Sequence, residues 1–127
     1  MQLIKVAAAT LNQIPLDWDG NQARIVRAIR AARQEGAALV VLPEMCIPGY
    51  GCEDAFQSRG VTLESWRILQ ELLPETRGLV VALGLPIMHR GMLYNAACLV
   101  ADGELLGLIA KRFLAGDGVH YEPRWFK

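Results

Sequence analysis

The chain has 127 residues, of which 53% are hydrophobic and 20% are charged, as expected for one globular domain with a buried core. Thirteen Lys and Arg balance thirteen Asp and Glu, so the charge predicts neither a nucleic-acid partner nor a membrane partner. The three cysteines lack a CxxC spacing, which argues against a disulfide framework and a zinc site. We therefore expect no metal, a cytoplasmic location and no secretory signal at the N-terminus.

The first part of the chain predicts a strand, a helix and a second strand. Residues Leu3–Leu11 alternate as a strand does, and Ala38–Leu42 is a short apolar run typical of a buried strand. The helix is expected over Asn21–Glu35, with Asp17 or Asp19 as its N-cap. Its apolar face comprises Ile25, Ile29 and Ala32, and its solvated face comprises Arg24, Arg27, Arg30 and Arg33. This β-α-β order indicates parallel strands.

The second half predicts a helix followed by three strands. Thr62 is expected to cap a helix that ends near Leu73, and Leu79–Leu85 is a buried strand that Pro86 should end. Leu93–Val100 and Leu105–Ala110 follow as a meander. Trp66, Leu69 and Leu73 are the expected inward side chains of the helix, and Arg90-Gly91 and Asp102-Gly103 are the expected turns. The fold class is thus α/β, with one sheet.

Two opposite charges stand where predicted buried strands meet loops. Glu44 follows the strand Ala38–Leu42, and Lys111 follows the strand Leu105–Ala110. Such charges are costly unless they are paired or used, and we expect these two to pair across the sheet edge. A carboxylate can act as a general base and an ammonium group can stabilise an oxyanion. On pattern alone a purely structural salt bridge is an equal alternative.

Other reactive side chains carry weaker signals. Cys46 and Cys52 lie near Glu44, but cysteine is usually a small core residue, and Cys98 lies within a predicted strand. His89 and His120 have no spacing typical of metal ligands. Tyr50, in the sequence PGYG, either lines a site or packs a turn, and we favour the site.

Three blocks of sequence, in order, carry a resemblance to a known family. They are LPEMCIPGYGCEDAF, GLPIMHRGMLYNAACLV and AKRFLAGDGVHYEPRWF. Together they resemble the nitrilase (carbon–nitrogen hydrolase) superfamily, and most of all the glutaminase domains of the glutamine-dependent NAD synthetase family. The resemblance implies a nitrilase-like α-β-β-α sandwich, of which residues 1–127 are the N-terminal part of a single domain.

The resemblance also implies roles for individual residues. Glu44 matches the family's general base, Lys111 matches the lysine that stabilises the tetrahedral intermediate, and Glu122 matches the second glutamate, which orients that lysine. The positions matched to the glutamine pocket are Tyr50, Asp117, His120 and Tyr121. The implied reaction is hydrolysis of the glutamine amide, supplying ammonia for ATP-dependent amidation of nicotinic acid adenine dinucleotide to NAD.

The chain departs from the family in what it lacks. The family's nucleophilic cysteine lies well beyond the position of Lys111, and none of the three cysteines here matches it. The synthetase domain, with its ATP and Mg, is also missing, so no cofactor is expected in this part. We expect the 127-residue chain alone to be inactive and to leave open strand edges. We expect the full-length enzyme to be a homo-oligomer. Two alternatives remain: another nitrilase-type amidase or carbamoylase, or a non-catalytic truncated subunit or binding module.

Overall fold

The computed structural model describes residues 3–127, which form one five-stranded sheet with helices packed against it. The elements in chain order are β1 (Val6–Ala8), α1 (Trp18–Gln34), β2 (Leu39–Val41), η1 (Tyr50–Gln57), α2 (Arg59–Leu72), η2 (Leu73–Thr76), β3 (Val80–His89), β4 (Met92–Ala101), β5 (Glu104–Ala110) and η3 (Glu122–Arg124).

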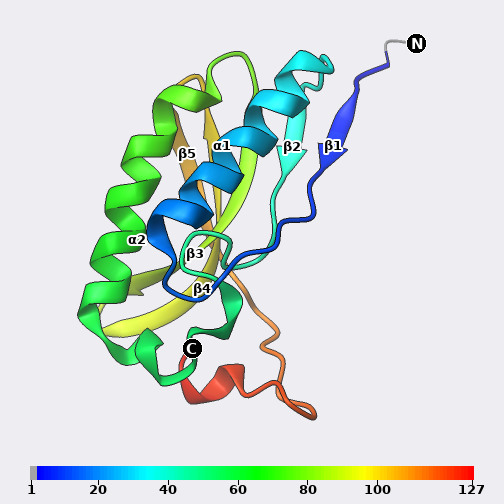
Figure 1. The fold of residues 1–127 in the computed structure, drawn as a ribbon. Coiled ribbons are helices and arrows are strands. Elements are labelled where there is room, and N and C mark those ends of the chain that lie inside the picture. Colours follow the sequence, from blue (N-terminus) through cyan, green and yellow to red (C-terminus); the bar gives the residue numbers. More distant parts are fainter. Residues whose placement is uncertain (1–2) are drawn as a thin grey trace.

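All five strands belong to one sheet, as the β-α-β-α-β pattern with a final meander predicts, and their order is β1-β2-β3-β4-β5. The strands β1, β2 and β3 are parallel, and β4 and β5 are added antiparallel. β5 therefore runs in the same direction as β2 and β3, so these three strands end at the same edge of the sheet. The C-terminal segment passes below that edge in Figure 1.

The predicted inward face of α1 is confirmed, because Ile25 and Ile29 are fully buried and Asp17 caps the helix through the backbone N–H of Gly20. The prediction that the arginines of α1 form a solvated row is wrong for Arg24. Its guanidinium group lies 2.8 Å from the Asp17 carboxylate and is largely covered by the preceding loop.

The second helix differs from its prediction at its start and in its rotation. Ser58, rather than Thr62, caps α2, because its side chain accepts a hydrogen bond from the Gly60 N–H. Ile68 and Leu69 are buried on the inner face, whereas Trp66 is 37% exposed, so the prediction of an inward Trp66 is wrong. The other buried residues of the helix, at helical spacing, are Val61, Ser65 and Leu72.

Both hairpin turns lie where they were predicted, but Pro86 does not end β3. Pro86 pairs with Asn95 of β4 inside a strand that continues to His89. In β3 the carbonyl groups of Ala82 and Gly84 point toward the β2 side. Because the backbone groups of every second residue in a strand point the same way, those of Pro86 also face the β2 side. β2 pairs only as far as Val41, opposite Ala82, so no ladder hydrogen bond requires an N–H at Pro86.

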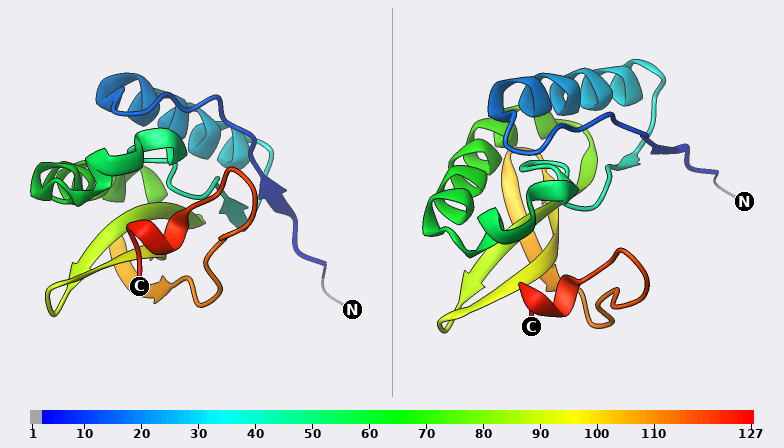
Figure 2. Two further views of the ribbon diagram at one scale, coloured as in Figure 1. Left: turned by 90° about the horizontal axis from the view of Figure 1, so that it is seen from below. Right: turned by 60° about the horizontal axis from the view of Figure 1, so that its bottom comes forward.

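The two faces of the sheet are covered unequally. Both helices lie on one side of the sheet, as the two views in Figure 2 show, and there Val81, Leu83 and Leu85 are buried in the core. On the opposite face Val41 is 46% and Ile109 is 58% exposed. No helix among residues 3–127 is both long enough and apolar enough to cross a membrane.

Candidate active site

The turn after β2 sets the position of Glu44. The Leu42 N–H donates to the Ala82 carbonyl just after the last β2–β3 pair, Val41 with Ala82. Pro43 follows and has no N–H to continue a ladder on the β1 side, where Val41 accepts from the Ala9 N–H. The chain then folds into a tight turn, in which the Gly49 N–H donates to the Met45 carbonyl over 2.8 Å. Met45 has a φ of +51°, a conformation that costs energy for a residue with a Cβ and that is often found at functional sites.

The turn crosses directly over β3, and Gly84 makes this crossing possible. A Cβ added at Gly84 would lie 2.3 Å from the Met45 nitrogen and 2.9 Å from the Glu44 carbonyl carbon. The backbone of Gly84, beyond the end of β2, is satisfied by the turn: its carbonyl accepts from the Ile47 N–H, and its N–H donates to the Cys46 thiol. The turn therefore takes the place of the missing strand.

This crossing explains how Glu44 reaches Lys111. β2 and β5 are separated by β3 and β4, so three strand spacings place their ends about 14 Å apart. The turn carries Glu44 over β3, and Lys111 begins directly after β5, where its N–H donates to the Asn95 carbonyl over 2.7 Å. The distance between the strand ends is therefore closed mainly by the turn, with the Lys111 side chain completing the reach.

Two carboxylates converge on the Lys111 ammonium group. Its Nζ lies 2.8 Å from Glu44 Oε1 and 2.9 Å from the Glu122 carboxylate. The ion pair expected between Glu44 and Lys111 is therefore present. The side chain of Glu122 is 1% exposed, whereas that of Glu44 is 40% exposed. Of the two carboxylates, Glu44 is the one that an incoming molecule can reach.

Glu122 is held as an anion by its hydrogen bonds. Burial acts to raise its pKa, but Lys111, the Ala115 N–H and the Tyr50 hydroxyl all donate to its carboxylate and hold the pKa below its usual value. Burial likewise acts to lower the pKa of Lys111, and the two carboxylates outweigh it and raise that pKa. The pair therefore stays ionised at neutral pH.

The residues assigned to a substrate pocket are only partly brought together. Tyr50, His120 and Tyr121 line one cavity of about 430 Å³, and the Tyr50 hydroxyl lies 2.8 Å from Glu122 Oε1 and 3.4 Å from His120 Nδ1. Asp117 is exposed and does not line this cavity; its carbonyl accepts the His120 N–H. Burial, followed by the hydrogen bond to Glu122, raises the pKa of Tyr50 to about 12, so its hydroxyl keeps its proton.

A second, largely apolar groove of about 340 Å³ opens on the sheet face that carries Val41 and Ile109, opposite the helices, which we call the bare face. Glu44, Asn95 and Lys111 lie along it together with Val41, Ala82, Ala97 and Ile109. The polar groups of the cluster thus face a hollow where an apolar segment or substrate can pack without competing for their hydrogen bonds.

None of the three cysteines is placed to act as a nucleophile. All three are buried, and burial raises the pKa of Cys46 to about 12 and those of Cys52 and Cys98 to about 11. The reactive form of cysteine is the thiolate, which these sites disfavour. The prediction that they are core residues is confirmed.

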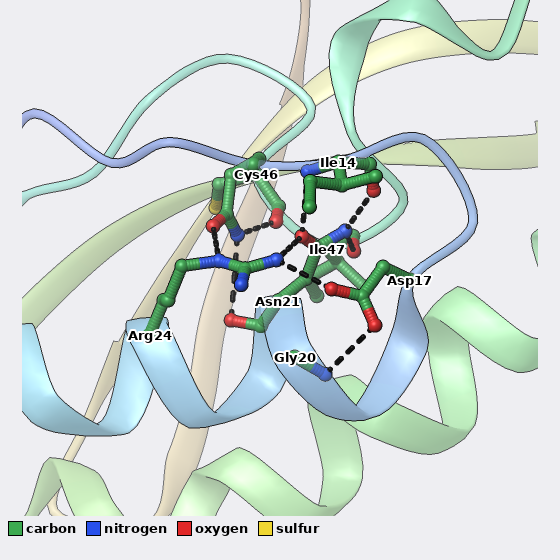
Figure 3. Close-up of polar contacts among 8 residues, drawn as sticks. Ile14, Asp17, Gly20, Asn21, Arg24, Cys46 and Ile47 are labelled. Atoms are coloured by element: carbon green, nitrogen blue, oxygen red, sulfur yellow. Dashed lines mark hydrogen bonds and ion pairs between the residues drawn. The ribbon is translucent and has the colours of Figure 1, made fainter.

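The turn is also held from its other side, at the N-terminal end of α1 (Figure 3). The buried amide group of Asn21 donates to the carbonyls of Ile14 and Ile47, at 2.8 and 3.1 Å, and accepts the Ile14 N–H. The Gln13 side chain donates to the Cys46 carbonyl. Because buried amides with all their partners are rigid, this network fixes the loop that carries Glu44.

Sequence reasoning missed two residues of the site, Gly84 and Asn95. Gly84 lies inside an apolar run, where a glycine signals a close approach of another backbone. Asn95 is a polar residue within the mainly apolar predicted strand Leu93–Val100, and in the structure it is 3% exposed on the face opposite the helices; a buried polar group of this kind needs hydrogen-bond partners. Both signals are present in the sequence.

The assembled site combines an accessible carboxylate, a fixed ammonium group and a buried carboxylate that holds it. Such a set can deprotonate a nucleophile and stabilise an oxyanion formed on a carbonyl carbon. Within residues 3–127, no group of three or more His, Cys, Asp or Glu side chains is arranged to hold a metal ion.

Comparison with known proteins gives a consistent result. The carbon–nitrogen hydrolase family matches residues 5–126. The chain is 42% identical over 126 residues to the glutamine-dependent NAD(+) synthetase of Saccharomyces cerevisiae and 37% identical over 125 residues to that of Drosophila melanogaster. These matches include 98% and 97% of this chain, but only 18% and 16% of the length of the two relatives.

Solved structures show the same relationship. The glutamine-dependent NAD(+) synthetase of Cytophaga hutchinsonii superposes with a TM-score of 0.95 at 42% identity, over 98% of this chain and 21% of that one. An amidase from Nesterenkonia sp. shares the fold alone, with a TM-score of 0.85 at 23% identity, over 98% of this chain and 47% of that one. The fold is therefore that of nitrilase-type enzymes, and the chain spans a fraction of each.

Proposed function

We propose a function from one premise: the chain belongs to the carbon–nitrogen hydrolase family, which it matches over residues 5–126. It forms the N-terminal part, residues 1–127, of a single nitrilase-fold domain that hydrolyses the amide of glutamine in a glutamine-dependent NAD(+) synthetase. The observation that carries the proposal is the convergence of two carboxylates on Lys111 Nζ, at 2.8 and 2.9 Å, at the edge where β2 and β5 end. The 42% identity to a synthetase of that name supports the choice of substrate.

The proposed reaction uses Glu44 as the base. Glu44 takes the proton of a cysteine thiol supplied by polypeptide outside residues 1–127, and the sulfur attacks the carboxamide carbon of glutamine. The proton then passes to the departing nitrogen, which leaves as ammonia when the C–N bond breaks. Glu44 next deprotonates a water molecule, whose oxygen attacks the thioester; the C–S bond breaks, the departing sulfur takes that proton, and glutamate is released. The partial exposure of Glu44 supports this role, because the base must meet both the thiol and the water.

Lys111 stabilises the oxyanion in both steps, and Glu122 holds Lys111 in place. An ammonium group fixed before the reaction stabilises developing charge without the cost of reorienting. Glu122 supports this role because it is buried, ionised and hydrogen-bonded to the backbone N–H of Ala115, so it cannot swing away. We assign Tyr50, His120 and Tyr121 to the glutamine pocket, with Asp117 shaping its loop through the backbone.

The ammonia would serve ATP-dependent amidation of nicotinic acid adenine dinucleotide to NAD in a separate synthetase domain. We assign ATP and Mg²⁺ to that domain, since the chain has no glycine-rich phosphate loop. The partner of this chain is therefore glutamine, and the complete enzyme is proposed to be a homo-oligomer. The bare sheet face supports association with further protein, because exposed apolar surface of this kind is normally covered.

The test is a glutaminase assay on the protein expressed from its complete coding sequence. Glutamate release from glutamine is measured for the wild type, for Glu44→Gln, and for the matched control Glu104→Gln, whose carboxylate is exposed at the start of β5. We expect Glu44→Gln to lower kcat at least about 10²-fold, the usual contribution of a positioned base, and Glu104→Gln to stay within twofold. A Glu44→Gln variant with wild-type kcat would refute the assignment.

A wild-type protein that releases ammonia from simple aliphatic amides or carbamoyl compounds, but not from glutamine, would overturn the substrate and favour another branch of the family. A protein inactive on every amide would overturn the enzymatic role and favour a binding module.

A further inference from the structure

Glu44, Lys111 and Glu122 form a charged cluster, and Asn95, with its neutral amide group, lies beside them. It lies in β4, is 3% exposed, and its side chain projects on the bare face of the sheet beside Glu44 and Lys111. Its Nδ2 donates to Glu44 Oε1 and lies 3.5 Å from Glu122 Oε1. A carboxylate only accepts hydrogen bonds, so the amide must present its NH₂ group to both glutamates.

Asn95 is joined to all three charged residues. Its side chain bridges the two glutamates, and its backbone carbonyl accepts the Lys111 N–H over 2.7 Å, which sets where the lysine leaves the sheet. Glu44 itself stands on a turn and is 40% exposed, so little packing limits its rotamers. The hydrogen bonds to Asn95 and Lys111 are therefore what keep its carboxylate in one orientation.

The choice of an amide follows from the charge of the cluster. Two carboxylates share one ammonium group, which leaves one negative charge in excess. A neutral NH₂ group joins the carboxylates without adding charge, whereas an aspartate would add a third carboxylate. A leucine would fill a similar volume but would leave Glu44 with Lys111 alone.

We propose that Asn95 is a positioning residue, whose amide group holds the Glu44 carboxylate against Lys111 and aims it along the groove on the bare face. The proposal rests on the proposed function for its catalytic consequence, but the orientation of Glu44 can be tested without it. Asn95 does not touch the substrate in this account and acts only through Glu44.

The kinetic test uses the protein of full coding length and three variants. We expect Asn95→Leu to lower kcat about 30- to 100-fold while KM changes less than threefold, because a misplaced base slows the chemical step. Asn95→Asp should be comparably impaired at pH 8, yet should recover as the pH is lowered, when its carboxyl group carries a proton and can again donate to Glu44. Its activity relative to the wild type should therefore rise with acidity.

The matched control is Asn21→Leu, which removes a fully buried amide of the same size that touches neither glutamate. It should lower Tm, but the pH dependence of its relative activity should stay flat. An Asn95→Asp variant whose activity relative to the wild type stays flat with pH, as that of Asn21→Leu should, would overturn the proposal.

A crystal structure of Asn95→Leu gives a readout that does not depend on activity. We expect the Glu44 carboxylate to leave its position, so that the distance from Oε1 to Lys111 Nζ grows from 2.8 Å to beyond hydrogen-bonding reach. An unmoved carboxylate would refute the proposal even if the wild type hydrolyses glutamine. A wild type inactive on glutamine together with a displaced carboxylate would refute the proposed function and leave the positioning role standing.

Discussion

Replacing Gly84 by alanine should move the base without touching it. The added Cβ would lie 2.3 Å from the Met45 nitrogen and 2.9 Å from the Glu44 carbonyl carbon. Non-bonded carbon contacts are normally about 3.5 Å or longer, so the peptide between Glu44 and Met45 must retreat by about 1 Å. Both neighbours are backbone atoms, which cannot rotate out of the way as a side chain can.

Two magnitudes follow from this displacement. Forcing extra volume into a packed region costs about 1–3 kcal/mol, and about 2 kcal/mol lowers Tm by roughly 4–8 °C in a domain of about 150–250 residues, closer to the size of the complete domain proposed here. A misplacement of about 1 Å at a reacting group lowers the rate about 10²-fold. We therefore expect Gly84→Ala to lower kcat for glutamine hydrolysis far more than its loss of stability would explain at 25 °C.

The matched control is Gly107→Ala in β5, where nothing lies within 4 Å of the added Cβ and φ is not positive. It should keep wild-type kcat and an unchanged or slightly raised Tm, because alanine fits a strand interior better than glycine. The measurements are kcat by glutamate release and Tm by calorimetry. A Gly84→Ala variant with wild-type kcat and Tm would refute the claim that the turn must cross β3 this closely.

Four further predictions follow from the site. Lys111→Met should lower kcat about 10²- to 10³-fold, as loss of an oxyanion donor does; retention of activity in the glutamate-release assay would contradict the role. Because the fold lowers the pKa of Glu122, its ionisation stabilises the fold above its unfolded pKa of about 4.3 and this stability is lost as the pH falls through the lower, folded pKa. Tm should therefore fall less between pH 5 and pH 3 in Glu122→Gln than in the wild type. Iodoacetamide at pH 8 should leave Cys46, Cys52 and Cys98 unlabelled in the native protein, since all three are buried with raised pKa values; rapid labelling seen by mass spectrometry would argue against their burial. The 127-residue chain produced alone should self-associate through the bare sheet face and release no glutamate, and a monodisperse monomer in light scattering would speak against this.

The sequence predicts the fold well where local rules decide it. The five strands of one sheet, the face of α1 that carries Ile25 and Ile29, and the two hairpin turns all follow from periodicity and turn chemistry. The errors arise where tertiary context decides. Pro86 is tolerated within β3 because β2 has already ended beside it, and no local rule reveals the length of a neighbouring strand.

The site is predicted in its charges but not in its geometry. Glu44 and Lys111 stand out because each follows a buried strand, and the pair is present. Their meeting depends on a turn that spans β3, which Gly84 permits, and this crossing is invisible to strand-by-strand reasoning. Glu122 and Tyr50 come from segments separated by 72 positions, and the family resemblance alone, not the spacing, brings Glu122 into the cluster.

The most direct test of the account is to find which cysteine a glutamine-like electrophile modifies. The protein of full coding length is treated with diazo-oxo-norleucine, with and without excess glutamine, and the modified peptide is identified by mass spectrometry. We predict one glutamine-protected label per chain, on a cysteine outside residues 1–127, and a strongly slowed labelling rate in Glu44→Gln. A protected label on Cys46, Cys52 or Cys98, or a labelling rate that does not depend on Glu44, would contradict the account.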